Sequence, residues 1–193
     1  MTCEPTCPSS PSVTVPDGIS RVAWARVPMV NAERLRRLKN VRRSGNTITA
    51  HTLVSLFVEP YAFELLKPWQ QTCYIPLLAQ LYATQWGRDL YAGNKKRTRE
   101  LNDITSLLVK KLAPMAVADA HLKLQFMGRQ TICAVAEWHD ALRLRDETLD
   151  EATLRWRSDV LIDFLVSGLS GSARDTRPFM QTRSNKNSTP VNR

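Results

Sequence analysis

A run of thirty residues without proline, from Met115 to Leu144, constrains the fold more than any other part of the chain. Within it, a set of residues recurs at steps of four, three, four, three and four: Leu124, Gly128, Thr131, Val135, Trp138 and Leu142. This spacing places the side chains on one side of an α-helix. Gly128, Ala134 and Ala136 are small enough to let another helix come close. The run therefore predicts one long helix packed against a second.

The rest of the chain after Ile19 is also helical in pattern, and no segment alternates long enough to predict a strand. We therefore expect an all-α fold, a six-helix domain over residues 19–171. The proline-rich residues 1–18 predict a disordered lead, and the polar, basic residues 172–193 predict a disordered tail. The expected helices span about residues 20–43, 47–67, 73–91, 95–112, 114–144 and 148–171.

Prolines and capping residues indicate where these helices begin. Pro28 lacks a backbone donor, so it predicts a kink or a late start in the first helix. Thr47 is expected to cap the second helix, and Pro114 to lie in the first turn of the fifth. Thr148 and Glu151 match a capping box, in which each side chain bonds to the backbone of the other, at the start of the last helix.

The composition excludes several classes of protein. Apolar residues make up 43% of the 193 residues, enough for a real core. No apolar run approaches the length of about 18 residues that predicts a membrane span, and the N-terminus does not match a signal peptide. Cys3 and Cys7 form a single pair with no histidine nearby, which disfavours zinc. We therefore expect a reduced, soluble, cytoplasmic protein without a metal or cofactor.

The net charge of +9 is concentrated in two stretches. Residues 21–43 hold eight Arg or Lys and one Glu, and residues 172–193 hold five and one Asp. Such stretches either contact phosphates or form solvated helix faces and tails. Non-specific nucleic-acid binding is therefore an alternative function. The candidate contacts in the first stretch are Arg34, Arg37, Arg42 and Arg43.

Two segments carry a resemblance to a known family. Residues 26–60, RVPMVNAERLRRLKNVRRSGNTITAHTLVSLFVEP, read as a basic helix, a loop and a helix that ends at a proline. Residues 143–171 end in Phe164-Leu165 followed by Gly168-Leu169. In this order the segments resemble the linker helix and the closing helix of the regulatory domain of tetracycline-repressor (TetR) family regulators. The likeness covers about residues 20–171 in helix order and length.

The resemblance implies a domain that binds a small, often apolar molecule and pairs through its last two helices as a four-helix bundle. The family's DNA-binding head needs at least ~40 residues. Only about twenty precede the first matching helix, so we expect this chain to lack the head. DNA binding would then require a head from a longer form or a partner. A truncated product that pairs with an intact regulator is a further alternative.

A ligand site in such a bundle would combine an apolar wall with a few polar groups. The candidate ligand-binding residues are Phe57, Tyr61, Leu78, Tyr82, Trp86, His121 and Gln125. His121 and Gln125 are four residues apart, which would let both orient a ligand oxygen from one side of a helix. The alternative is that His121 lies at the surface or in an internal hydrogen bond, and that the aromatic residues belong to an ordinary core.

The apolar stripes of the last two helices predict the dimer interface. The candidates are Val135, Trp138, Leu142, Leu161, Phe164 and Leu165. Uncovered, they would form a sizeable apolar patch, and two-fold pairing of two helices from each subunit would cover it. The alternative is that these residues belong only to the core of their own chain.

No motif indicates catalysis. The three histidines, His51, His121 and His139, are scattered, and no nucleophile elbow, metalloprotease motif or phosphate-binding loop is present in the sequence. The sequence therefore predicts a TetR-like regulatory protein rather than an enzyme: a homodimer that binds an unidentified small, apolar ligand.

Overall fold

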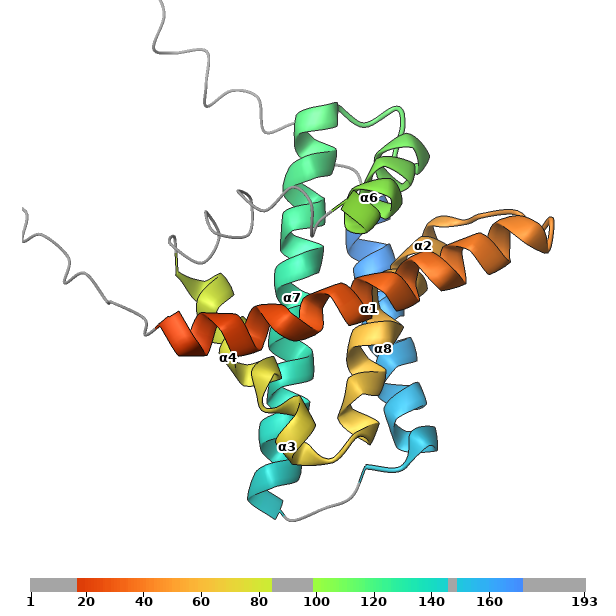
Figure 1. Cartoon of the computed structure of the whole chain (residues 1–193). Coiled ribbons are helices and arrows are strands. Elements are labelled where there is room, and N and C mark those ends of the chain that lie inside the picture. Colours follow the sequence, from red (N-terminus) through yellow and green to blue (C-terminus); the bar gives the residue numbers. More distant parts are fainter. Residues whose placement is uncertain (1–16, 85–98, 146–148, 172–193) are drawn as a thin grey trace, which may run out of the picture.

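The computed structural model describes residues 17–84, 99–145 and 149–171 (Figure 1). Over these residues the chain forms helices and no strand, which confirms the all-α prediction. Most of the expected lead, the expected tail and Trp86 lie outside the described residues. The elements are α1 (Asp17–Arg43), α2 (Ala50–Ala62), the 3-10 helix η1 (Phe63–Leu66), α3 (Trp69–Thr72), α4 (Tyr74–Ala83), α6 (Arg99–Lys111), α7 (Val117–Arg145) and α8 (Glu151–Ser170).

The long helices set the arrangement of the others. In Figure 1, α7 and α8 run along the length of the molecule and α1 crosses them at a steep angle. The helix α2 packs against α8, α4 packs against α7, and α1 contacts α2, α4 and α6. Five helices, α1, α2, α4, α6 and α7, are thereby brought around one region of the interior.

Prolines decide two of the predicted helix starts. The helix α1 begins at Asp17 and continues through Pro28, so of the kink and the late start predicted there, the late start does not occur. The first-turn position predicted for Pro114 is wrong. The long helix α7 begins at Val117, and Pro114 lies before it, after a cis peptide bond with Ala113. A proline is compatible with a helix when neighbouring contacts hold the turn around it, and sequence alone does not show those contacts.

The caps of α2 and α8 each lie two residues beyond the predicted position. The Thr49 hydroxyl, rather than that of Thr47, accepts a hydrogen bond from the backbone N–H of Thr52 at 3.0 Å. The Asp150 carboxylate, rather than Thr148, accepts from the N–H three residues later at 2.6 Å. This hydrogen bond lowers the pKa of Asp150. Both segments contain several residues able to cap, and the backbone conformation selects one of them.

The core consists of two clusters of buried residues, and the helices α1, α2, α7 and α8 each contribute to both. The first core cluster contains Leu38 of α1 and Leu53 and Phe57 of α2, packed with apolar residues of α6, α7 and α8. The second core cluster contains Tyr61 of α2 and Leu78 of α4, packed with residues of α1, α7 and α8. A cavity lined by residues of both clusters remains between them. None of the described helices is long and apolar enough to cross a membrane.

Candidate functional site

A cavity of about 730 Å³ lies between α1, α2, α4, α6 and α7. Its volume falls in the range of small-molecule sites in proteins. Apolar and aromatic side chains from both core clusters form most of the wall: Val27, Val30, Phe57, Tyr61, Tyr74, Leu78, Leu101, Leu124 and Ile132. Polar or charged side chains complete it: Asn31, Arg34, Asn102, Thr105, His121, Gln125 and Arg129, beside Tyr82, Phe126 and Gly128.

Six of the seven candidate ligand-binding residues lie in the wall of this one cavity. They are Phe57, Tyr61, Leu78, Tyr82, His121 and Gln125. The seventh, Trp86, lies outside the described residues. The candidates come from three helices, α2, α4 and α7, so the fold brings together residues that are up to 68 positions apart in the sequence. Their role in binding a ligand stays a prediction.

One charged side chain, Arg34, is buried in the cavity wall with only 7% of its surface exposed. Its Nε and Nη2 donate to the backbone carbonyl of Phe57 at 3.0 and 2.7 Å, and Nη1 donates to Asn31 Oδ1 at 2.9 Å. The guanidinium lies 4.5 Å from the centre of the Phe57 ring, a cation–π distance. These contacts join α1 to α2 and hold the charge in a fixed position.

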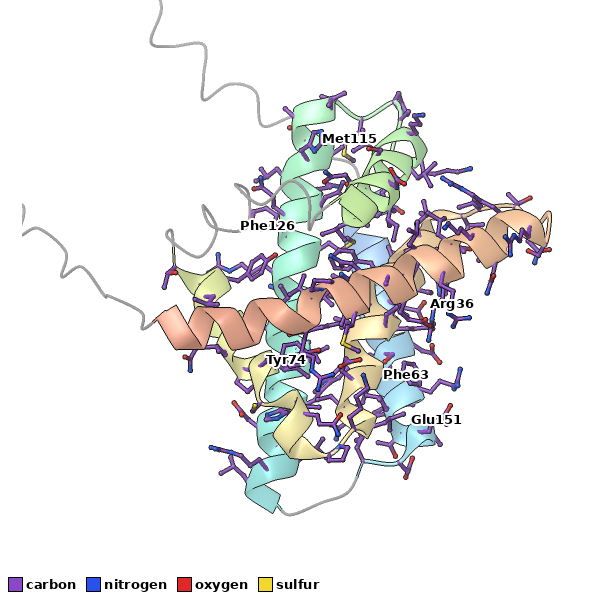
Figure 2. The ribbon with its side chains drawn as sticks, viewed as in Figure 1. Arg36, Phe63, Tyr74, Met115, Phe126 and Glu151 are labelled. Carbon is purple, nitrogen blue, oxygen red and sulfur yellow. The ribbon has the colours of Figure 1, made fainter. Side chains whose placement is uncertain are left out.

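Two buried tyrosines stand in the part of the wall near α4. Burial raises the pKa of the Tyr61 and Tyr74 phenols, so both are neutral. Tyr74 donates to Glu64 Oε2 at 3.3 Å, and Glu64 is paired with Lys67 Nζ at 2.5 Å. The Tyr61 hydroxyl has no hydrogen-bond partner among the residues described. Figure 2 shows Tyr74 beneath α1 and Phe126 beside α7.

The rim of the cavity is polar and belongs largely to α7. His121, Gln125 and Arg129 follow one another at steps of four, so they lie along one side of the helix. All three are exposed, as is Asn102 of α6. The cavity thus has a buried apolar interior and a rim of exposed polar side chains that are able to donate hydrogen bonds.

The six candidate interface residues fall into different environments. Val135 and Leu165 are buried in the core of their own chain. Trp138, Leu142 and Leu161 are partly buried, and Trp138 packs against the second core cluster. Phe164 alone of the six is mainly exposed, at 62%. Of the candidate set, Phe164 is therefore the residue best placed to contact another molecule.

Phe164 belongs to an exposed apolar stripe on α8 that sequence reasoning identified only in part. Trp156, Val160 and Phe164 are all exposed and are spaced by four residues; we call them the outer stripe of α8. At 100° per residue they lie almost opposite the buried residues of the same helix. Arg157 and Asp163 flank the stripe, three residues to either side of Val160. Asp163 Oδ1 also lies 3.5 Å from His51 Nε2.

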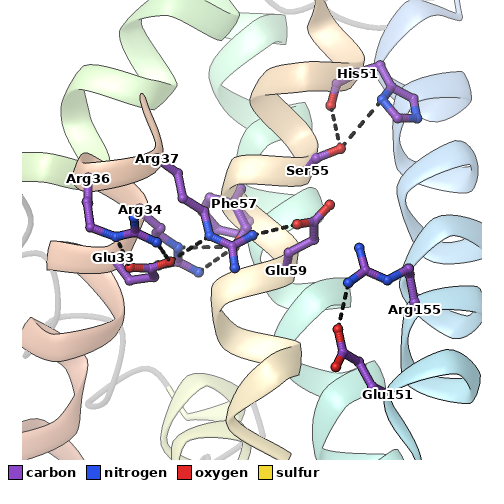
Figure 3. A network of polar contacts seen from close by, with 10 residues as sticks. All are labelled: Glu33, Arg34, Arg36, Arg37, His51, Ser55, Phe57, Glu59, Glu151 and Arg155. Atoms are coloured by element: carbon purple, nitrogen blue, oxygen red, sulfur yellow. Dashed lines mark hydrogen bonds and ion pairs between the residues drawn. The ribbon is translucent and has the colours of Figure 1, made fainter. Parts of the chain in front are cut away.

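The four candidate nucleic-acid contacts do not form one surface. Arg34 is buried in the cavity wall. Arg37 pairs with Glu33 of the same helix at 2.7 Å and with Glu59 at 2.6 Å, and the second pair joins α1 to α2 (Figure 3). Arg42 and Arg43 are exposed in the last turn of α1. Two of the four are therefore engaged inside the protein, and the remaining pair is a small basic patch at one helix end.

No group of three or more His, Cys, Asp or Glu among the described residues is arranged to hold a metal ion. Comparison with models of protein families, with curated proteins and with solved structures finds no match for this chain.

Sequence reasoning missed Arg34, Asn31, Tyr74 and Arg129 as wall residues. Arg34 did leave a signal, because it interrupts an otherwise apolar strip on the first helix and was interpreted as a phosphate contact. A basic residue in an apolar strip predicts either a break in the helix's packing or a buried charge with a function. The contact with the Phe57 carbonyl, which decides between them, joins residues 23 positions apart.

Proposed function

We propose that residues 17–171 form a small-molecule-binding regulatory domain of the TetR type, which pairs with a second copy through its closing helices. The observation that supports it best is the cavity of about 730 Å³. If the two core clusters served only to stabilise the fold, we would expect side chains to fill this space, because cavities reduce the free energy of unfolding. An apolar interior with a polar rim instead matches the usual form of a ligand site.

The test uses a panel of acyl, aromatic and drug-like compounds and follows the melting temperature. A ligand that binds only the folded protein, present at one hundred times its Kd, stabilises it by about 2.7 kcal/mol. We expect at least one compound to raise the melting temperature by ~5 °C or more. No shift with any compound would contradict the proposal.

A glycine in the cavity wall offers a matched pair of variants. A Cβ atom at Gly128 would lie 3.7 Å from the Phe57 ring, and a Cβ at Gly168 of α8 would meet nothing within 4 Å. Gly128→Leu should fill part of the cavity and abolish the shift, while both variants gain helix propensity of about 1 kcal/mol. Gly168→Leu should keep the shift. Equal ligand responses from the two variants would place binding outside the cavity.

The pairing is proposed to occur through the outer stripe of α8. An antiparallel pair with its two-fold axis at Val160 would place Trp156 against Phe164 of the partner subunit. The same register would place Arg157 beside Asp163 of the partner subunit, so that opposite charges meet on both sides of the axis. Each aromatic side chain buries ~150–250 Å². Because Trp156 and Phe164 are 64% and 62% exposed in the single chain, roughly two thirds of that area is left to bury, and flanking side chains such as Arg157 and Asp163 would complete the ~1,000 Å² of a specific interface.

Sedimentation of the purified chain tests the pairing. We expect a dimer at tens of micromolar, and a monomer at that concentration would contradict this part of the proposal. Ligand binding and pairing are separate measurements, so one part can fail while the other stands.

A further inference from the structure

One residue of the cavity wall, Tyr61, has a buried polar atom without a partner. The residue is 4% exposed and lines the cavity. Its hydroxyl makes no hydrogen bond with any of the residues described. His139 and Ser158 also have buried side-chain atoms without a hydrogen-bond partner in the described part of the chain, but neither residue lines the cavity. Among the described residues, an unused buried hydrogen-bonding group and the cavity therefore coincide at Tyr61.

The absence of a partner for this hydroxyl is an exception that needs an explanation. A hydroxyl that leaves water without gaining a hydrogen bond destabilises the folded protein, so most buried polar atoms in proteins have a partner. Tyr74 shows the usual arrangement in the same wall, because its hydroxyl donates to Glu64 Oε2 at 3.3 Å. Burial raises the pKa of the Tyr61 phenol, so its hydroxyl keeps the proton that it can donate. The exception is explained if the partner of Tyr61 belongs to a molecule bound in the cavity.

We infer that the cavity selects mainly apolar molecules that carry a carbonyl or hydroxyl oxygen, and that this oxygen pairs with the Tyr61 hydroxyl. The apolar part of the molecule lies against wall residues such as Phe57 and Leu78. Because Tyr61 belongs to the second core cluster, the oxygen lies at the buried wall rather than at the exposed rim on α7. This inference rests on the proposed ligand-binding function and adds the chemical class of the ligand and the residue that recognises it.

Two compounds of nearly the same shape test the inference. 4-Methylacetophenone carries a carbonyl oxygen at the position where 4-isopropyltoluene carries a methyl group. Their dissociation constants are measured by calorimetry on the full chain, with and without Tyr61→Phe, which removes only the hydroxyl. We expect Tyr61→Phe to weaken binding of the ketone at least ~3-fold relative to the hydrocarbon, as the loss of one hydrogen bond predicts. An unchanged relative affinity would overturn the inference.

Tyr74→Phe is the matched control. It removes the hydroxyl of another tyrosine in the same wall, but that hydroxyl already donates to Glu64. The variant should therefore leave the relative affinity for the ketone and the hydrocarbon unchanged. An equal relative loss for the ketone in both variants would overturn the assignment to Tyr61.

The melting temperatures of the two variants without any compound give a second test. Tyr74→Phe should lower the melting temperature, because the Glu64 carboxylate loses a donor. Tyr61→Phe should not lower it, because the hydroxyl that it removes has no partner among the residues described. A fall as large as that of Tyr74→Phe would show that the Tyr61 hydroxyl has a partner within the chain, and it would overturn the inference.

The outcomes separate this inference from the proposed function. If both compounds bind and Gly128→Leu abolishes their binding, but Tyr61→Phe leaves their relative affinity unchanged, the cavity is a ligand site and the inferred role of Tyr61 is wrong. If neither compound binds, the inference is wrong, and the wider panel decides whether the cavity binds any ligand at all.

Discussion

The cavity wall and the outer stripe of α8 are both apolar surfaces, but they differ in shape and in the charges beside them. The cavity is concave, and two charged side chains of the described residues line it: Arg34, which donates to Phe57 and Asn31, and Arg129, which is exposed at the rim. The outer stripe is a convex ridge of Trp156, Val160 and Phe164, flanked by charges of both signs. A concave apolar surface suits a small molecule, and an exposed stripe flanked by charges of both signs suits a second copy of itself. Shape and neighbouring charge therefore distinguish the two proposed functions, which hydrophobicity alone would not.

The largest expected contrast lies between the two sides of α8. Ile162 is 0% exposed, and Val160 is more than half exposed. Ile162→Ala should lower the free energy of unfolding by about 2–5 kcal/mol, because it leaves a hole in the core. Val160→Ala should change the stability of the monomer by less than ~0.5 kcal/mol. Urea denaturation at low protein concentration measures both. Similar losses of unfolding free energy in the two variants would show that the outer stripe of α8 is packed within its own chain.

The next contrast concerns assembly rather than folding. Phe164→Glu should raise the dissociation constant of the dimer at least ~100-fold, because a charge would be buried at the centre of the contact. Met29→Glu is the control, since Met29 is 53% exposed on α1, away from the stripe. Analytical ultracentrifugation of both variants compares them directly. A dimer that survives Phe164→Glu must use another surface.

A charge reversal sharpens the register of the pairing. Asp163→Lys should weaken the dimer by roughly tenfold, because it places two positive charges together across the axis. Adding Arg157→Glu should recover most of the loss if the two residues meet between subunits. The dissociation constants of the single and double variants form the measurement. If the double variant is weaker than either single one, the two charges do not face each other in the dimer.

The smallest expected effect concerns the contact between α1 and α2, next to the cavity. Hydrogen bonds and charge from Arg36 and Arg37 lower the pKa of Glu33 from 4.5 to about 2. The contribution of this carboxylate to stability is therefore fully present above about pH 4.5, and it is lost as the pH falls toward 2. Because the group is partly exposed, the contribution at neutral pH is about 0.2–1 kcal/mol.

Glu33→Gln should show this loss at pH 7 and match the unchanged protein near pH 2. Thermal unfolding of both proteins across this range measures the difference. Glu151→Gln is the control, because it removes the exposed ion pair between Glu151 and Arg155 on the surface of α8. A difference that persists near pH 2 would mean that Glu33 acts through packing rather than through its charge.

Much of the fold follows from the sequence because helical periodicity is a local signal. The stripe from Leu124 to Leu142 lies in α7, and every expected helix has a counterpart in the described residues. The expected third helix, 73–91, is the least accurate: α4 begins at Tyr74 and is described only to Ala83, and the short helix α3 before it, Trp69–Thr72, was not predicted. The other errors concern the positions of helix ends, because several consecutive residues are able to cap a helix.

The two surfaces were predictable to different degrees. The wall residues of α2, α4 and α7 were predictable from the sequence, because aromatic and polar side chains share helix faces there. The burial of Arg34 was not predictable, because it depends on a carbonyl 23 residues away. On α8, Leu161, Phe164 and Leu165 were predicted to share one interface, but Leu165 is buried in the core and Phe164 is 62% exposed. A helix with apolar residues on two sides does not reveal which side faces inward until the neighbouring helices are placed.

The central claim is that five helices enclose a cavity that binds a small, mainly apolar molecule. A crystal structure of the chain with the compound that raises the melting temperature most tests it most directly. The account predicts the compound between Phe57 and Leu78, in contact with Leu124. A structure in which side chains of the protein fill that space, and the compound is absent or bound along the outer stripe of α8, would contradict it.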